Sequence, residues 1–146
     1  MEELLELKTC LEQQRYADAL LLLGEMEEMS KDDKMHKIHS YILILLIHLI
    51  KQQAEQRTTR SWGFAIRYSV REVQQINKRR KAGGYYLTAN ELQKIIAEAY
   101  ETALEKAALE AFEGQYDEIQ LSQKIDKATV LTQALQFTLL FHRQFS

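Results

Sequence analysis

The sequence has no proline, only five glycines and one cysteine among its 146 residues. Proline breaks helices and glycine weakens them, so their scarcity favours long, uninterrupted helices. The single cysteine, Cys10, cannot form an intramolecular disulfide, and a zinc site built on a cysteine pair is excluded too. The phosphate-binding patterns GxxxxGK[ST] and GxGxxG and the GxSxG nucleophile motif are also missing. These absences favour a protein that is not an enzyme and that needs no cofactor.

The sequence also lacks a hydrophobic run long enough to cross a membrane. The most apolar stretch, YILILLIHLI, occupies residues 41–50, whereas a transmembrane helix needs about 20 apolar residues. We therefore expect residues 41–50 to form a buried helix at the centre of a bundle. The first residues, MEELLELK, are acidic, and no small-residue cleavage site follows them. That composition argues against secretion and predicts a cytoplasmic protein without a membrane segment.

Apolar residues recur at three- and four-residue steps along most of the chain, which is the period of an α-helix. Ser30 precedes two aspartates and is predicted to cap the start of a helix, and Thr88 and Glu91 fit a capping box. No alternating pattern predicts a strand. We predict helices at residues 3–13, 16–29, 31–56, 59–81, 88–114 and 128–143, and a loop with a helical turn at 115–127.

Short connections between these helices predict an all-α fold. The expected architecture is an antiparallel bundle of about four long helices with one or two short extra helices. No linker, repeat or low-complexity tract divides the chain. A single domain covering residues 1–146 is therefore predicted.

Four stretches of the chain carry a resemblance to a known family. They are GEMEEM (24–29), HSYILILLIHLIK (39–51), RSWGFAIRYSVREV (60–73) and EAYETALEKAALEAF (98–112). In this order and spacing the chain resembles the prokaryotic domain-of-unknown-function family twenty-nine, whose members are small helical proteins. It departs from the family at Ala54-Glu55, where a proline is usual, and at residues 82–86, where a Ser-Pro-Ser-Leu turn is usual. The resemblance implies a helical bundle and implies no activity.

One group of side chains is a candidate metal or acid–base site. His48 interrupts the apolar run, and Glu27 and Glu28 continue the inner side of the preceding predicted helix. If these two helices are neighbours, imidazole and carboxylate can bind Zn²⁺ or iron, or exchange a proton. However, the chain lacks the Glu-x-x-His pair that di-iron bundles use. A His–carboxylate contact that only stabilises the fold is the favoured interpretation, and a metal-binding protein or metal-dependent enzyme is the alternative.

Charge is distributed unevenly, although the net charge is only −2. Residues 57–81 contain eight Lys or Arg and one Glu, which gives +7. Residues 1–30 and 91–118 each contain eight acids and two bases, which gives −6. On a helical wheel the basic residues form a stripe opposite the apolar face of their helix. The candidate interaction surface consists of Arg60, Phe64, Arg67, Arg71 and Lys78.

The sequence does not specify a function. The patterned charge favours a small cytoplasmic interaction module that binds an unknown protein partner or a second copy of itself. A solvated face or an internal salt-bridge network is the simplest interpretation of the basic stripe. Nucleic-acid binding through residues 57–81 is a disfavoured alternative, because the protein is acidic overall, with a pI near 6.1.

Overall fold

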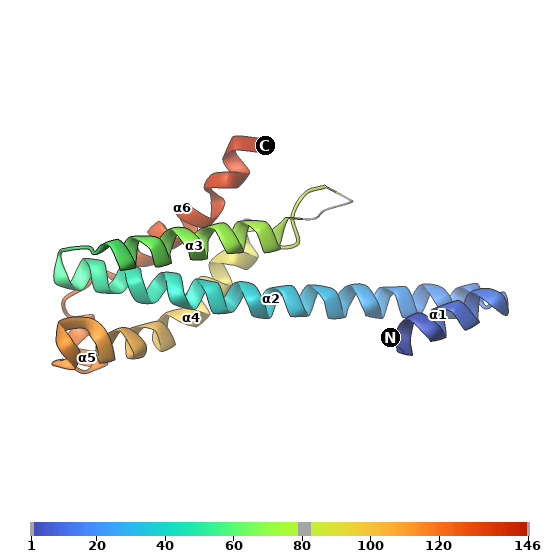
Figure 1. The fold of residues 1–146 in the computed structure, drawn as a ribbon, viewed down its shortest axis with the longest axis horizontal. Coiled ribbons are helices and arrows are strands. Elements are labelled where there is room, and N and C mark those ends of the chain that lie inside the picture. Colours follow the sequence, from blue (N-terminus) through green and yellow to red (C-terminus); the bar gives the residue numbers. More distant parts are fainter. Residues whose placement is uncertain (1, 79–82, 146) are drawn as a thin grey trace. The chain divides into compact units, whose positions relative to one another are not determined.

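The computed structural model describes the backbone of residues 2–78 and 83–145 and the side chains of residues 4–24, 31–78 and 83–139. Over this part of the chain it contains helices and no strand (Figure 1). The predicted all-α fold is confirmed. The elements are α1 (Glu2–Glu12), α2 (Tyr16–Glu55), α3 (Arg60–Asn77), α4 (Ala89–Glu110), the 3₁₀ turn η1 (Ala111–Gly114), α5 (Glu118–Ser122) and α6 (Lys127–Phe145).

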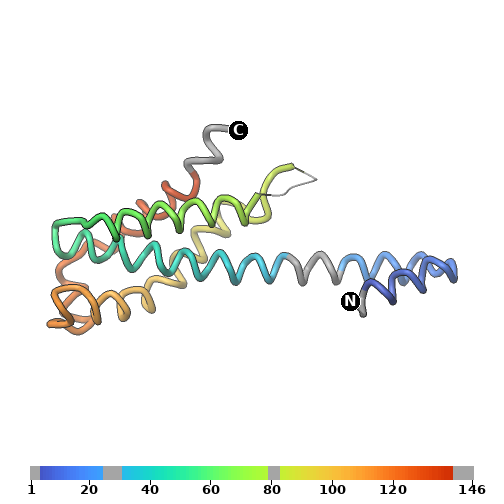
Figure 2. Tube along the Cα trace, in the orientation of Figure 1, coloured from blue at the N-terminus to red at the C-terminus, as the bar shows by residue number. Residues whose placement is uncertain are grey.

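The chain divides into two compact units, residues 1–36 and 37–146, and α2 contributes to both. The single domain inferred from the sequence stays a prediction. The separate helices predicted at 16–29 and 31–56 are wrong, because α2 runs as one helix from Tyr16 to Glu55 (Figure 1). Figure 2 traces the same chain as a tube along the Cα atoms. The cap signal at Ser30 is local. The Glu, Met and Lys residues around it are good helix formers, and no Gly or Pro follows to stop the helix.

The first unit is a helical hairpin. Its turn is a Schellman motif, in which Arg15 N donates to Cys10 O at 2.8 Å and Gln14 N donates to Leu11 O at 3.2 Å. Gln14 adopts the positive φ, 59°, that this turn requires. Cys10 is buried, whereas Leu20 and Leu21 are each 70% exposed. The hairpin therefore presents leucine side chains to solvent.

The core of the second unit is the last part of α2. In the run 41–50, the side chains with at most 2% exposure are Ile42, Leu45, Leu46, Leu49 and Ile50. The prediction of a buried central helix is confirmed. α3 lies beside this part of α2 and runs antiparallel to it, since Tyr41 contacts Tyr68 and Lys51 lies over Trp62 (Figure 1).

α3 ends at Asn77, four residues before the predicted end at 81. The Asn77 side-chain oxygen accepts a hydrogen bond from Leu87 N at 2.8 Å, and its carbonyl accepts one from Tyr86 N at 2.8 Å. These bonds tie the segment before α4 to the end of α3. Residues 79–82 lie outside the described residues.

α4 begins with the predicted capping box. Thr88 Oγ1 accepts from Glu91 N at 3.2 Å, and Glu91 Oε1 accepts from Thr88 N at 3.1 Å. One face of the helix consists of small side chains, which lets α4 approach its neighbours η1, α5 and α6 closely. On this face, residues with at most 1% exposure are Ala99, Ala103, Ala107 and Ala111.

The chain bends sharply between α4 and α5. Phe112, Glu113 and Gly114 have φ values of 51°, 58° and 77°. A Cβ at Gly114 would lie 3.1 Å from Leu109 O, so glycine fits this position best. α4 thus ends at Glu110, four residues before the predicted end at Gly114, and α5 is the helical turn predicted within 115–127. Among the described residues, no helix has the length and hydropathy needed to cross a bilayer.

Candidate interaction surface

α3 turns one face to the core and the other to solvent. Its first turn is capped by Thr59, whose Oγ1 accepts a hydrogen bond from Trp62 N at 3.1 Å. Ser69 and Val73 are buried, as the apolar spacing predicts. The opposite face is exposed, and it contains four of the five residues of the predicted surface, Arg60, Phe64, Arg67 and Arg71. The fifth, Lys78, is exposed too but follows the last residue of α3. We call this surface the α3 face.

The arginines of the α3 face are not neutralised by neighbouring acids. Arg60, Arg67 and Arg71 form no ion pair with any residue that the structure describes. These three residues therefore do not form the internal salt-bridge network that was one interpretation of the stripe. Arg67 and Arg71 are like charges one turn apart, which costs a helix about 0.2–0.5 kcal/mol. The α3 face thus retains charge that does not stabilise the fold.

Aromatic side chains lie among these arginines. Phe64 is 59% exposed and Tyr68 is 41% exposed. Their rings stack at a centroid distance of 5.8 Å, and Tyr41 of α2 meets the Tyr68 ring edge-on at 6.1 Å. Burial raises the pKa of Tyr41, and Tyr68 and Glu72 raise it further. Exposed aromatics beside arginines are the composition that protein interfaces favour.

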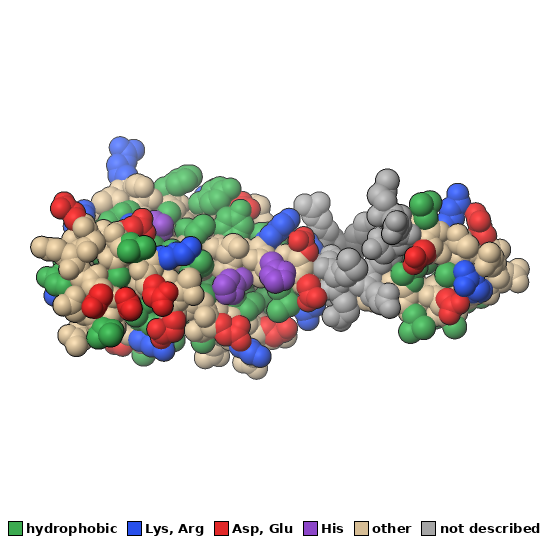
Figure 3. Space-filling view, turned by 90° about the horizontal axis from the view of Figure 1, so that it is seen from below, with side chains coloured by type: hydrophobic (Ala, Val, Ile, Leu, Met, Phe, Trp, Pro, Cys, Tyr) green, Lys and Arg blue, Asp and Glu red, His purple; other side chains and the backbone are tan. Residues whose placement is uncertain are grey.

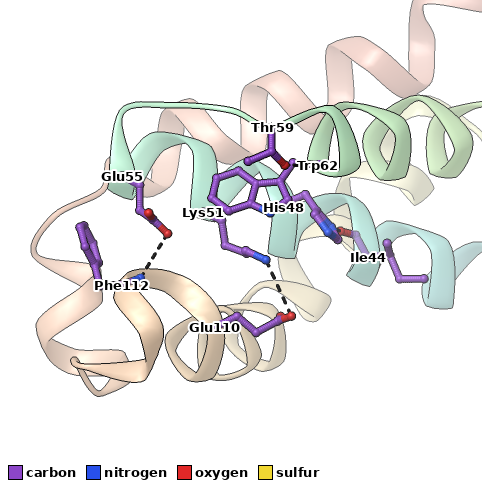
Figure 4. A network of polar contacts seen from close by, with 8 residues as sticks. All are labelled: Ile44, His48, Lys51, Glu55, Thr59, Trp62, Glu110 and Phe112. Carbon is purple, nitrogen blue, oxygen red and sulfur yellow. Dashed lines mark hydrogen bonds and ion pairs between the residues drawn. The ribbon is translucent and has the colours of Figure 1, made fainter.

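The opposite side of α3 is held by Trp62, which contacts two cations. Lys51 Nζ lies 4.7 Å and Arg57 Cζ 4.8 Å from the centre of its ring. Lys51 is only 6% exposed, and its ammonium lies 3.7 Å from Glu110 Oε1. Figure 4 shows the Lys51 side chain below the indole and directed toward Glu110. We call these four residues the Trp62 clamp.

The clamp joins three of the four sequence stretches that carry the family resemblance. Lys51 ends the stretch 39–51, Trp62 belongs to 60–73, and Glu110 to 98–112. The contacts among them link α2, α3 and α4. The carboxylate of Glu110 and the indole ring compensate the charge of the buried Lys51 ammonium. The clamp therefore has a structural role that needs no ligand. It fixes how α3 lies on the core, and thereby which side of α3 reaches solvent.

Glu55 joins the end of α2 to the bend after α4. Its Oε2 accepts a hydrogen bond from Phe112 N at 3.2 Å, and its Oε1 accepts one from Arg57 Nε at 2.9 Å. Burial acts to raise the pKa of Glu55. The bonds from Phe112 and Arg57 and the charges of Arg57 and Lys51 outweigh burial and lower the pKa below 4.5.

This carboxylate makes the stability of the fold depend on acid pH. Because the pKa of Glu55 is lower in the folded chain than in the unfolded one, its contribution is present above the unfolded pKa and is lost as pH falls through the folded pKa. We expect Glu55→Gln to lower the unfolding free energy at pH 7 by about 1 kcal/mol and to flatten its fall below pH 4.5. Urea unfolding at a series of pH values measures both effects. If the unfolding free energies of the two chains fall in parallel below pH 4.5, Glu55 is not the group responsible.

The candidate metal site remains a prediction. His48 Nδ1 lies 2.8 Å from the carbonyl oxygen of Ile44, one turn earlier in α2. The side chains of Glu27 and Glu28 lie outside the described residues. The two neighbouring helices on which the site was premised are instead the single helix α2, so that premise is wrong. In the described part of the chain, no group of three or more His, Cys, Asp or Glu side chains is placed to hold a metal ion.

Fold and surface together define an all-helical protein with a basic, aromatic helix face. Comparison with protein families places it more narrowly. The sequence model of the family described as "Domain of unknown function DUF29" matches residues 4–136, and the chain belongs to that family. The resemblance seen in the sequence is thereby confirmed. No curated protein and no solved structure matches the chain.

Sequence reasoning missed the two tyrosines of the aromatic group. Tyr68 follows Phe64 by one helical turn, so the helical spacing was a usable signal for it. Tyr41 lies in a different helix, and its contact with Tyr68 depends on how α2 and α3 are aligned. No feature of the sequence gives that alignment directly.

Proposed function

We propose that this chain is a non-enzymatic interaction module of the prokaryotic cytoplasm, and that the α3 face binds an acidic protein. The observation that carries the proposal is a group of three arginines that pair with no acid among the described residues, on the same face as two stacked, exposed aromatic rings. Neither feature contributes to the core. Both are used when a partner covers the rings and supplies carboxylates.

The chemistry of the surface supports a protein partner over nucleic acid. The chain carries a net charge of −2, and residues 91–118 carry −6. That acidic segment repels a nucleic acid whose backbone extends beyond the α3 face, whereas the acidic patch of a protein can be confined to the α3 face. The single cysteine, Cys10, is buried and free, which fits a reducing compartment.

Charge reversal on the α3 face tests the proposal. A tagged chain is used to capture partners from cells of its native host, and the doubly substituted chain R67E/R71E is compared with it. We expect the captured partner to be acidic and to bind R67E/R71E about a hundredfold more weakly, because like charges then face each other.

The matched control is K8E/R15E, which makes the same change of charge on the hairpin. Lys8 and Arg15 are 74% and 48% exposed and form ion pairs only one helical turn or less away. This chain is expected to retain the partner. Equal binding by R67E/R71E and the unsubstituted chain, or elution of the unsubstituted chain alone at every salt concentration, would overturn the proposed function.

A further inference from the structure

We infer that the acidic partner of the α3 face is a second copy of this chain, bound through an acidic stripe on α4. The inference rests on the proposed function, since it names the partner of that same face. The acidic stripe consists of Glu98, Glu101, Glu105 and Leu109, all exposed. Steps of three and four residues place them on one side of α4.

The acidic stripe has the same composition as the α3 face with the charge reversed. Leu109 is 78% exposed, the largest exposure among the large apolar side chains that the structure describes. Figure 3 views the molecule from below, and several Asp and Glu side chains, drawn in red, gather on one part of the surface seen there. The stripe thus offers an apolar side chain flanked by carboxylates, and the α3 face offers aromatic rings flanked by arginines.

The spacing of the two surfaces also matches. When α3 of one copy lies antiparallel to α4 of another, Phe64 is brought opposite Leu109. The next pairs along the helices are then Arg67 with Glu105 and Arg71 with Glu101, because each pair lies three or four residues from the one before. The apolar residues meet apolar residues and both arginines meet carboxylates in one alignment.

Little inside the chain competes for these carboxylates. Glu98 and Glu105 form no ion pair with a described residue. Glu101 lies 3.8 Å from Lys127, and both side chains are more than half exposed. Such an exposed pair is weak and is readily exchanged for an arginine that comes with an apolar contact.

The position of the two surfaces determines the kind of assembly. In Figure 1, α3 lies above the core part of α2 and the second half of α4 lies below it. The α3 face of each copy therefore meets the acidic stripe of the next, and the acidic stripe of the first copy stays available. Such a head-to-tail contact is heterologous and produces rows of copies larger than a dimer.

Sedimentation velocity on the full chain tests the inference with a charge exchange between two variants. The unsubstituted chain is expected to form larger species as its concentration rises and to dissociate as salt is added. The variants R67E/R71E and E101K/E105K are each expected to associate about a hundredfold more weakly. Mixed in equal amounts, they should assemble again, because each reversed surface then meets its complement. Circular dichroism of each variant establishes that the helices are intact.

The controls separate this inference from the proposed function. K8E/R15E and E6K/E12K carry the same charge changes on the hairpin and should assemble like the unsubstituted chain. If the unsubstituted chain is monomeric at every concentration, or if the mixed variants stay monomeric, the second copy is not the partner. The proposed function then still stands if another acidic protein is captured through Arg67 and Arg71. Capture that is insensitive to R67E/R71E would remove both.

Discussion

Trp62→Ala is expected to lower the free energy of unfolding by about 2 kcal/mol, less than removal of a fully buried aromatic costs, because the indole is half-buried. The indole covers the ammonium of Lys51 and the guanidinium of Arg57 at 4.7 Å and 4.8 Å. Its loss opens a cavity and leaves a 6%-exposed lysine with Glu110 as its remaining charged contact in the clamp. Urea unfolding followed by circular dichroism measures the change.

Phe64→Ala is the matched control for this experiment. Phe64 is an aromatic residue two positions further along α3, but it is 59% exposed and lies on the other side of the helix. Its removal is expected to change the unfolding free energy by less than about 0.5 kcal/mol. The two substitutions then show that one aromatic side chain of α3 stabilises the fold and the other does not. Equal losses from both substitutions would contradict the orientation of α3 described above.

The orientation of α3 was predictable because helical period alone determines it. Ser69 and Val73 are buried on the side of α3 that a helical wheel of the sequence assigns to the core. Arg60, Arg67 and Arg71 are exposed on the opposite side. The capping box at Thr88 was predictable for a similar reason, since both of its partners lie within one turn. Features formed by residues close in sequence are the ones that sequence reasoning recovered.

Features that depend on several helices were not recovered. Leu131, Leu135 and Leu139 recur along α6 at four-residue steps, but they are half-buried and line a groove between α4 and α6. Val130, Ala134 and Thr138 are buried instead. The side of α6 that faces inward depends on its crossing with the alanine face of α4. The most apolar stripe of a helix and its inward side need not coincide, and the helical period cannot distinguish them.

The candidate site shows the same division. The helical spacing placed Arg60, Phe64, Arg67 and Arg71 on one exposed side of a helix, since these residues share one element, whereas Lys78 lies beyond its end. Their use as an interaction surface stays a prediction. The Trp62 clamp was not predicted, because Lys51, Trp62 and Glu110 come from three helices and meet only in the folded chain. The helix boundary predicted at Ser30 is wrong for the opposite reason, because there a local signal was present but did not determine the structure. There a local cap signal was outweighed by the helix-forming residues on both sides, and α2 continues.

Leu46→Ala is expected to lower the free energy of unfolding by about 3 kcal/mol. Leu46 is 0% exposed in the middle of the run 41–50, and the loss combines the transfer of its side chain to water with the cavity left behind. Ile44→Ala is the control on the same helix, because Ile44 is 39% exposed and two residues away. Its expected cost is below about 1 kcal/mol.

The pair of substitutions also tests how the core supports the α3 face. Tyr41 begins the run that contains Leu46 and Lys51 directly follows it, and these two residues of α2 contact Tyr68 and Trp62 of α3. If Leu46→Ala remains folded at low temperature, these contacts keep α3 in place, and capture through Arg67 and Arg71 should be unchanged there. As the temperature rises, capture and helical circular dichroism should be lost together, and earlier than in Ile44→Ala. Loss of capture before any loss of helix would mean that α3 is not held on the core by these contacts.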